Sequence, residues 1–305
     1  MKSINKLLLV VDPDIDSDFI IQRAKLIAEK YNSSVLLFMS KPNALSPDSV
    51  NSKSLSSLFF KKQQQLFAEQ YEKMLQVLRG EFSAMKIRVS AEFSSAKNSP
   101  DAILKKILEY KPDITIKSIQ KPSSFNILIT NTDWYLIQNS PCPLLLVKSQ
   151  KWHPDGSIIA AVDPLHVKAQ QNQLDHLLLD TAANLAGNLQ LTPRAFHSYL
   201  PDMGTMFPKV LDAGEYIKEV KLNHKVKVEE LSKSHGISSE NVTLAKGDLI
   251  KSLLLCIKKE RGNILVLGAL SRNFVERAIV GSTAERILYD TPCDVLIMKN
   301  TQPAQ

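Results

Sequence analysis

The chain repeats one pattern at an offset of 151 residues. The tripeptide Val-Asp-Pro at 11–13 returns at 162–164. A second set of matches, with Thr, Pro-Cys and Lys in the same spacing, relates 132–148 to 283–299. Because one offset holds near both ends of the unit, the repeat covers a whole domain rather than a single motif.

The length of the chain agrees with this repeat. A chain of 305 residues has the size of two ordinary domains, each able to bury a core without disulfides or metal. Between the two copies lies a short polar stretch at 148–156 that ends in turn residues. We therefore expect two domains, residues 1–150 and residues 151–305.

Composition excludes several classes of protein. No apolar run approaches the roughly 20 residues that span a bilayer, so no membrane partner is expected. The three cysteines form no CxxC motif, which predicts neither a disulfide framework nor a zinc site. The net charge is +7, but the lysines are dispersed without interleaved aromatic residues, so we expect no nucleic-acid partner. A cytoplasmic location fits this composition best.

Strand-like and helix-like segments alternate through both copies, which predicts α/β domains with a parallel sheet covered on both faces. The expected strands lie at 6–12, 34–38, 86–93, 114–116, 144–147, 157–162, 189–197, 242–245, 264–267 and 295–299. The expected helices begin near 16, 54, 99, 167, 213, 248 and 283. The fold class is thus two tandem, doubly wound, Rossmann-like five-stranded sheets, which we expect to pair through their fifth strands about a pseudo-two-fold axis.

In doubly wound sheets, ligands bind beyond the carboxyl ends of the strands. After the fourth expected strand of the second copy come Gly268 and Ser271, then Gly281 and Ser282 at the start of a helix. A glycine loop that leads into a helix can hold phosphate, because its backbone N–H groups and the helix dipole face the anion. The same residues also admit a structural interpretation, since Ser282 and Glu285 form the S-x-x-E pattern of a capping box.

The spacing Gly268-x2-Ser271-x9-Gly281-Ser282, with Asp163 after the first strand, resembles the universal stress protein family. Family members that bind ATP carry G-x2-G-x9-G-[S/T], and this chain has serine in place of the second glycine. The resemblance covers essentially the whole chain. It implies a non-enzymatic stress-response protein with the adenine-nucleotide-binding, hydrolase-like fold.

The resemblance also implies a site for ATP or AMP in the second copy. Asp163 would lie near the adenine or ribose. The phosphates would be lined by Gly268, Ser271, Gly281, Ser282 and Thr283.

The first copy departs further from the family pattern. Ser118 stands where Gly268 does, one residue is missing from the following loop, and Thr130 replaces the equivalent of Gly281. A β-branched residue resists positive φ and blocks close approach of a phosphate. We expect no nucleotide phosphate site in this copy, and we interpret Asp12 as structural.

Other functions were weighed from the residues. Asp12 and Asp14 resemble the D-x-D of phosphatases, but the carboxylates needed after the fourth strand are missing. The six histidines show no metal-ligand spacing, so no metal site is expected.

The apolar loop 199–208 offers an alternative function, in which it packs over an acyl-bearing small molecule. The other interpretation of this loop is that it packs on the other domain. Slow ATP hydrolysis is a further alternative, although no general base stands beside the glycine loop.

Overall fold

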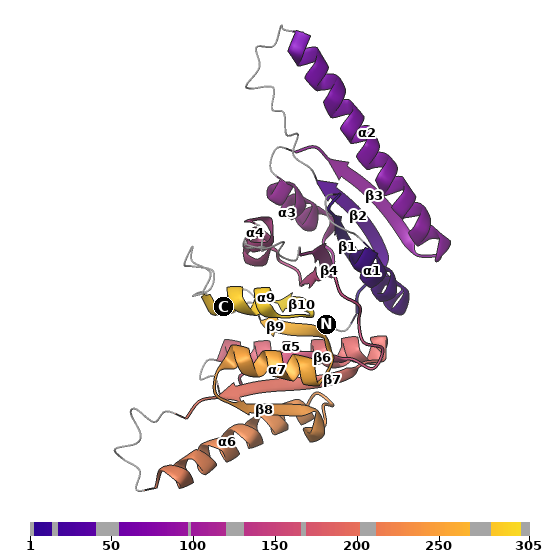
Figure 1. Ribbon diagram of the computed structural model, residues 1–305. Helices are drawn as coiled ribbons and strands as arrows, with labels where there is room; N and C mark the ends of the chain where they lie inside the picture. The colour runs from indigo at the N-terminus through magenta and orange to yellow at the C-terminus, as the bar shows by residue number, and fades with distance from the viewer. Residues whose placement is uncertain are drawn as a thin grey trace. The chain divides into compact units, whose positions relative to one another are not determined.

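The computed structural model (Figure 1) describes residues 3–13, 18–40, 55–96, 99–119, 131–165, 169–201, 212–268 and 282–299. The chain divides into two compact units, Ser3–Ser149 and Gln150–Gln305. We call them the N-terminal unit and the C-terminal unit, and each is described by itself.

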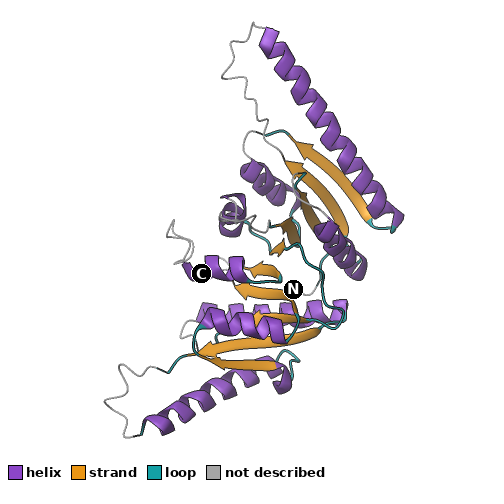
Figure 2. Cartoon of the chain, in the orientation of Figure 1, coloured by secondary structure: helices purple, strands orange, loops and turns teal. Residues whose placement is uncertain are grey.

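The N-terminal unit is built on a parallel sheet in the order β3-β2-β1-β4-β5. Its strands are β1 (Lys6–Val11), β2 (Ser34–Ser40), β3 (Arg88–Ser94), β4 (Ile114–Ser118) and β5 (Leu144–Val147). Its helices are α1 (Asp18–Tyr31), α2 (Leu55–Ala84), α3 (Ser99–Tyr110) and α4 (Asn131–Asn139). Strands and helices alternate along the chain, as Figure 2 shows.

The C-terminal unit repeats this arrangement, with a parallel sheet in the order β10-β9-β6-β7-β8. Its strands are β6 (Ser157–Ala161), β7 (Thr192–Tyr199), β8 (Val242–Lys246), β9 (Gly262–Gly268) and β10 (Asp294–Met298). Its helices are α5 (Ala169–Leu189), α6 (Ala213–Lys233), the 3-10 turn η3 (Ser239–Asn241), α7 (Leu249–Lys259) and α9 (Ser282–Asp290). The predicted fold class, two doubly wound five-stranded sheets, is confirmed.

Helices cover both faces of each sheet. In the N-terminal unit, α1 contacts α2 through the Lys25–Glu81 ion pair, and α3 contacts α4. Neighbouring residues of β3 face the two layers: the ring of Phe93 packs against Tyr71 of α2, whereas Glu92 forms an ion pair with Lys106 of α3. Strands covered in this way carry continuous apolar runs, and accordingly Leu7, Leu8 and Leu9 of β1 are fully buried.

Helix ends show that the two units share backbone geometry as well as strand order. Asn32 after α1 and Gln190 after α5 both take a left-handed conformation, with φ of 52° and 57°. Lys111 after α3 and Arg261 after α7 do the same, with φ of 51° and 49°. Such a residue ends a helix and turns the chain into the next strand. The repeat is therefore present in the local turns that set the strand positions.

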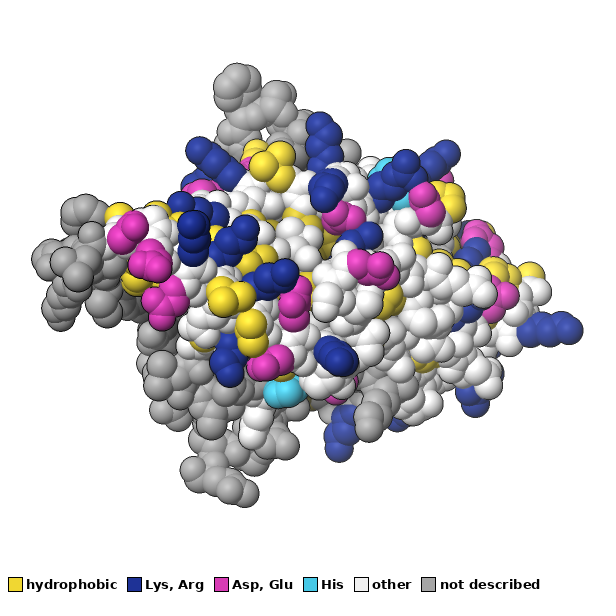
Figure 3. Space-filling model, turned by 90° about the horizontal axis from the view of Figure 1, so that it is seen from below, with side chains coloured by type: hydrophobic (Ala, Val, Ile, Leu, Met, Phe, Trp, Pro, Cys, Tyr) yellow, Lys and Arg dark blue, Asp and Glu magenta, His cyan; other side chains and the backbone are white. Residues whose placement is uncertain are grey.

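The surface carries charges of both signs. On the face drawn in Figure 3, Lys and Arg side chains are interspersed with Asp and Glu. None of the helices in the described ranges combines the length and apolar character that crossing a bilayer requires. That the protein binds no nucleic acid stays a prediction.

The segment that leads into the C-terminal unit is held by one buried amide. The side chain of Asn263 accepts a hydrogen bond from the backbone N–H of His153 at 2.8 Å and donates one to its carbonyl at 2.8 Å. A Cβ atom added at Gly156 would lie 2.4 Å from the Asn263 amide nitrogen. Gly156 is therefore required so that Asn263 can reach the backbone of His153.

We predict that Gly156→Ala lowers the free energy of unfolding by about 2–3 kcal/mol, because displacing the Asn263 amide leaves buried polar groups without partners. Gly187→Ala is the matched control. Gly187 lies inside α5 with no atom within 4 Å of an added Cβ, so this change should raise stability by about 0.5–1 kcal/mol. Urea unfolding of both variants measures the difference, and equal stability of the two would contradict the role of Gly156.

Candidate functional site

Two neighbouring strand ends define the candidate site of the C-terminal unit. Strands β6 and β9 pair with Ala160 opposite Val266, so Asp163 and Gly268 follow adjacent strands at the carboxyl edge of the sheet. We call this place the C-terminal crevice. The helix that follows the loop, α9, begins at Ser282 and includes Thr283. The predicted residues Ser271 and Gly281 lie outside the described residues, so their role stays a prediction.

Asp163 presents its carboxylate to solvent while its backbone is anchored. Its side chain is 48% exposed. Its backbone N–H donates to Oδ1 of Asp175 at 3.3 Å, and its own Oδ1 accepts from the N–H of Leu165 at 3.5 Å. Asp175 is 5% exposed and comes from α5. A half-exposed carboxylate on a fixed backbone can accept hydrogen bonds from a ligand's hydroxyl or amino groups.

Gly268 has a packing role that the sequence did not indicate. A Cβ atom added there would lie 2.5 Å from Cδ2 of Leu174 in α5. A side chain at position 268 would therefore displace Leu174, so the packing of β9 on α5 favours glycine whether or not a phosphate binds. The glycine alone is not evidence for a phosphate loop.

A stacked histidine pair lies under the C-terminal crevice. Nδ1 of buried His197, on β7, lies 3.0 Å from the carbonyl oxygen of Val162, and its Nε2 lies 2.7 Å from Nδ1 of His224 on α6. Because a carbonyl only accepts, Nδ1 of His197 carries the proton, and its Nε2 accepts from His224. Tyr199 stacks on His224 at a ring distance of 5.0 Å. The pair therefore joins β6, β7 and α6 beside Asp163.

The environment of His224 disfavours its charged form. Burial lowers the pKa of His224 below its usual value, the neighbouring His197 lowers it further, and Asp163 opposes both effects. A histidine with a lowered pKa is neutral in the folded state at pH values where the unfolded chain already binds a proton.

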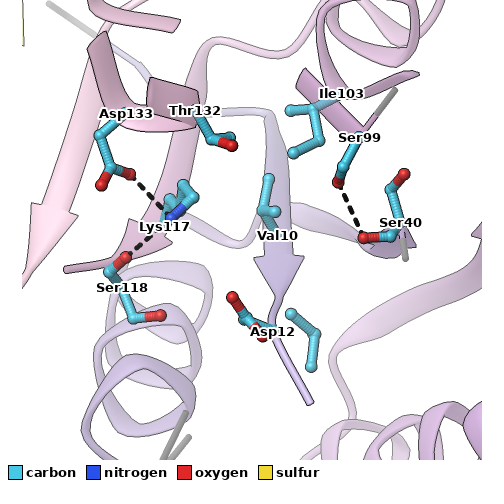
Figure 4. A pocket seen from close by; sticks show the side chains of 10 residues that line it. Val10, Asp12, Ser40, Ser99, Ile103, Lys117, Ser118, Thr132 and Asp133 are labelled. Carbon is cyan, nitrogen blue, oxygen red and sulfur yellow. Dashed lines mark hydrogen bonds and ion pairs between the residues drawn. The ribbon is translucent and has the colours of Figure 1, made fainter. Parts of the chain in front are cut away.

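The corresponding strand ends of the N-terminal unit enclose a pocket of about 140 Å³. Figure 4 shows that its walls come from the ends of β1 and β4 and from α3 and α4. We call it the N-terminal pocket. It is lined by Val10, Val11, Asp12, Ser40, Ser99, Ile103, Lys117, Ser118, Thr132 and Asp133.

A buried ion pair lies at the centre of the N-terminal pocket. Nζ of Lys117 lies 2.7 Å from Oδ1 of Asp133, with side-chain exposures of 6% and 1%. By the repeat, Lys117 and Asp133 correspond to Leu267 and Ala284 in the C-terminal unit. The N-terminal unit has thus placed its own carboxylate in the first turn of α4, where the resemblance would put a phosphate. A carboxylate at this turn disfavours a second anion, so the geometry agrees with the expectation that this copy has no phosphate site, which stays a prediction.

One signal of this pair is present in the sequence. Lys117 interrupts an apolar strand that is buried on both faces, and a lysine in such a place needs a partner. Its partner follows 16 positions later in a separate helix, and nothing local indicates Asp133.

Four of the histidines form two hydrogen-bonded pairs that their spacing in the sequence does not indicate. Besides His197 and His224, Nδ1 of His176 lies 2.7 Å from Nε2 of His235, whose Nδ1 lies 2.6 Å from Oδ1 of Asp180. Within the described ranges, no three His, Cys, Asp or Glu side chains are arranged to hold a metal ion. Of the apolar loop at 199–208, the structure describes only the first three residues, and Leu200 there is 76% exposed.

Comparison with known proteins places this geometry in a family. The model of the universal stress protein family matches residues 3–148 and again residues 158–299. The chain belongs to the universal stress protein family. It contains two copies of the domain, which confirms the resemblance inferred from the residues.

Full-length relatives share the tandem layout. Over 320 residues the chain is 24% identical to universal stress protein E of Photorhabdus laumondii, with 98% of this chain and 96% of the relative covered. Over 300 residues it is 22% identical to the universal stress protein E homolog of Haemophilus influenzae, with 96% of each covered. Both relatives are named as the E type of universal stress protein.

Solved structures show the same fold. A universal stress protein from Archaeoglobus fulgidus superposes with a TM-score of 0.66 at 16% identity, covering 97% of this chain and 98% of that one. A functionally unknown protein from Pseudomonas aeruginosa gives a TM-score of 0.71 at 20% identity, covering 98% and 93%. At these identities the likeness establishes the fold of this universal stress protein and nothing about its ligand.

The ion pair of the N-terminal pocket predicts a non-additive pair of substitutions. Lys117→Leu or Asp133→Ala alone should lower the free energy of unfolding by about 3–5 kcal/mol, because each leaves a buried charge without its partner. The double variant carries the residues that the C-terminal unit has at these positions, and it should recover most of that loss. A double-mutant cycle by urea unfolding measures the coupling, and additive losses would exclude a buried ion pair.

The lowered pKa of His224 predicts a loss of stability in weak acid. The unfolded chain binds a proton on this residue at a higher pH than the folded chain does. Its contribution to stability is therefore complete above the unfolded pKa near 6.5 and is lost as the pH falls below it. His224→Gln keeps a donor for His197 but does not titrate, so its urea midpoint should fall less between pH 7.5 and 5.5 than that of the wild type. Replacing exposed His153 by Gln is the control, and the same pH dependence in all three proteins would contradict this role.

Proposed function

We propose that this universal stress protein binds an adenine nucleotide, ATP or AMP, in the C-terminal crevice, and that the N-terminal unit binds none. Family membership supports the class of ligand, and the position of Asp163 supports the place. The proposal assigns the adenine or ribose to Asp163 and the phosphates to Gly268, Ser271, Gly281, Ser282 and Thr283.

The observation that carries the proposal is the difference between the two units at the first turn of the helix after the fourth strand. In the N-terminal unit the carboxylate of Asp133 occupies this turn and Lys117 neutralises it. In the C-terminal unit the corresponding residues are Leu267 and Ala284, which carry no charge. Position 284 of the C-terminal unit thus lacks the carboxylate that Asp133 supplies, and Glu285, one residue later, belongs to the capping-box pattern with Ser282. A helix N-terminus favours an external anion.

We propose binding without turnover. A general base must reach the proton that it removes, and His197, the buried imidazole beside Asp163, is engaged through both ring nitrogens. The proposed role is therefore that of a stress-response protein that senses or stores a nucleotide. Binding of an acyl-bearing molecule at the loop 199–208 stays an alternative, and a location in the cytoplasm stays a prediction.

Calorimetric titration with ATP and with AMP tests the proposal. The wild type should bind one nucleotide per chain, and Gly281→Val should weaken binding by tenfold or more, because a β-branched residue blocks close approach of a phosphate. Thr130→Val, at the corresponding position of the N-terminal unit, is the matched control and should bind as the wild type does.

Equal affinity of wild type and Gly281→Val would remove the C-terminal crevice from consideration. Binding of two nucleotides per chain would contradict the proposal that the N-terminal unit binds none. Native mass spectrometry of the purified protein adds a separate readout, since a co-purified acyl-bearing molecule would favour the alternative ligand.

A further inference from the structure

The N-terminal pocket is a cavity with a polar and an apolar wall, although we propose no phosphate site there. Its volume is about 140 Å³, whereas a cavity of about 10–15 Å³ is enough to hold a single water molecule. The pocket therefore has room for several water molecules or for one small organic molecule. It lies at the carboxyl edge of β1 and β4, the edge at which parallel sheets bind ligands.

One buried ammonium in this pocket has a hydrogen-bond donor to spare. Nζ of Lys117 carries three N–H groups. It donates one to the carbonyl of Ser118 at 3.1 Å and directs another to Asp133 at 2.7 Å. In the described part of the chain, nothing accepts the third. Because Lys117 lines the pocket and its side chain is only 6% exposed, a molecule bound in the pocket can supply this acceptor.

A second polar atom of the lining lacks a partner. Oγ of Ser40 is buried, and among the described residues it makes no hydrogen bond. The carbonyl of Ser40, by contrast, accepts from the hydroxyl of Ser99 at 2.8 Å, as the dashed line in Figure 4 shows. A buried hydroxyl without a partner costs free energy. Two unsatisfied groups, one a donor only and one both donor and acceptor, thus border the same cavity.

The charges around the cavity decide what kind of molecule satisfies these groups. Lys117 is neutralised by Asp133, and Asp12 adds a further carboxylate to the lining. Among the described lining residues there is thus one more formal negative charge than positive charge, which disfavours phosphates and carboxylates. Hydroxyl groups of a neutral molecule can accept from Lys117 and both donate to and accept from Ser40 and Thr132.

We propose that the N-terminal pocket binds a small uncharged molecule rich in hydroxyl groups, of the polyol or monosaccharide class. The chemistry of the lining supports this class, because its other side chains include Ser99, Ser118 and Thr132. Val10, Val11 and Ile103 supply an apolar wall against which the carbon frame of such a molecule packs. This site is separate from the C-terminal crevice and does not depend on nucleotide binding there.

Ligand-observed NMR and calorimetry test the proposal with myo-inositol, xylitol and D-ribose as neutral probes and ribose 5-phosphate as the charged probe. At least one neutral probe should bind, and ribose 5-phosphate should bind at least tenfold more weakly than D-ribose. Ser40→Ala should lower the affinity for the neutral probe about fivefold, which corresponds to the loss of one neutral hydrogen bond. The double variant Lys117→Leu with Asp133→Ala should lower the affinity for the same probe tenfold or more, because a charge-assisted hydrogen bond is lost.

Controls separate binding from folding. Ser40→Ala should leave the urea midpoint unchanged or raise it, since its hydroxyl has no partner in the unliganded protein. Ser90→Ala, at an exposed position of β3, should leave both affinity and stability unchanged. Gly281→Val should retain polyol binding, which distinguishes this site from the proposed nucleotide site.

Three results would overturn the proposal. The first is that none of the neutral probes binds, which would make the cavity a site for water only. The second is equal binding of D-ribose and ribose 5-phosphate. The third is a bound neutral probe whose affinity is the same in Ser40→Ala, in the double variant and in the wild type.

Discussion

Burial of both sheet faces is the constraint on which the rest of this structure depends. The strands lie between two layers of helices, so their side chains are apolar along almost their whole length, as fully buried Leu7 to Leu9 illustrate. Polar side chains then have one place to gather, the carboxyl edge where the strands end and loops begin. Asp12, Ser40 and Ser118 in the N-terminal unit and Asp163 in the C-terminal unit all lie there. Differences in ligand between the two units must therefore arise at this edge.

The two units differ at a pair of positions whose side chains contact each other in the N-terminal unit. Lys117 with Asp133 stands where the sister copy has Leu267 with Ala284. Either single exchange leaves one buried charge unpaired, at a cost of about 3–5 kcal/mol. That is a large fraction of the roughly 5–15 kcal/mol by which domains are stable. The two positions are therefore expected to change together, and once the pair exists, neither partner is easily lost. The pair places a carboxylate in the first turn of α4, and this is the physical basis for proposing that the N-terminal unit binds no nucleotide.

Most of the fold could be read from the sequence because it depends on local patterns. The alternation of apolar runs with amphipathic segments predicted the strands, and β5 was found at its observed bounds, 144–147. The repeat predicted that both units share one strand order. The site was less predictable, because its contacts join residues distant in sequence. His197 meets His224 across 27 positions, and no local spacing reports such a pair.

Gly268 shows why a motif residue is weak evidence for its ligand. Glycine at the end of β9 is favoured by the approach of Leu174 from α5, and this packing reason holds equally in a protein that binds no phosphate. Asp163 is different, because its carboxylate is half-exposed at the sheet edge although one of its oxygens accepts from the N–H of Leu165. Its backbone is fixed by Asp175, and the preceding carbonyl of Val162 holds His197 in one tautomer. The C-terminal crevice therefore presents a carboxylate on a rigid base, which is the arrangement that ligand recognition requires and sheet stability does not.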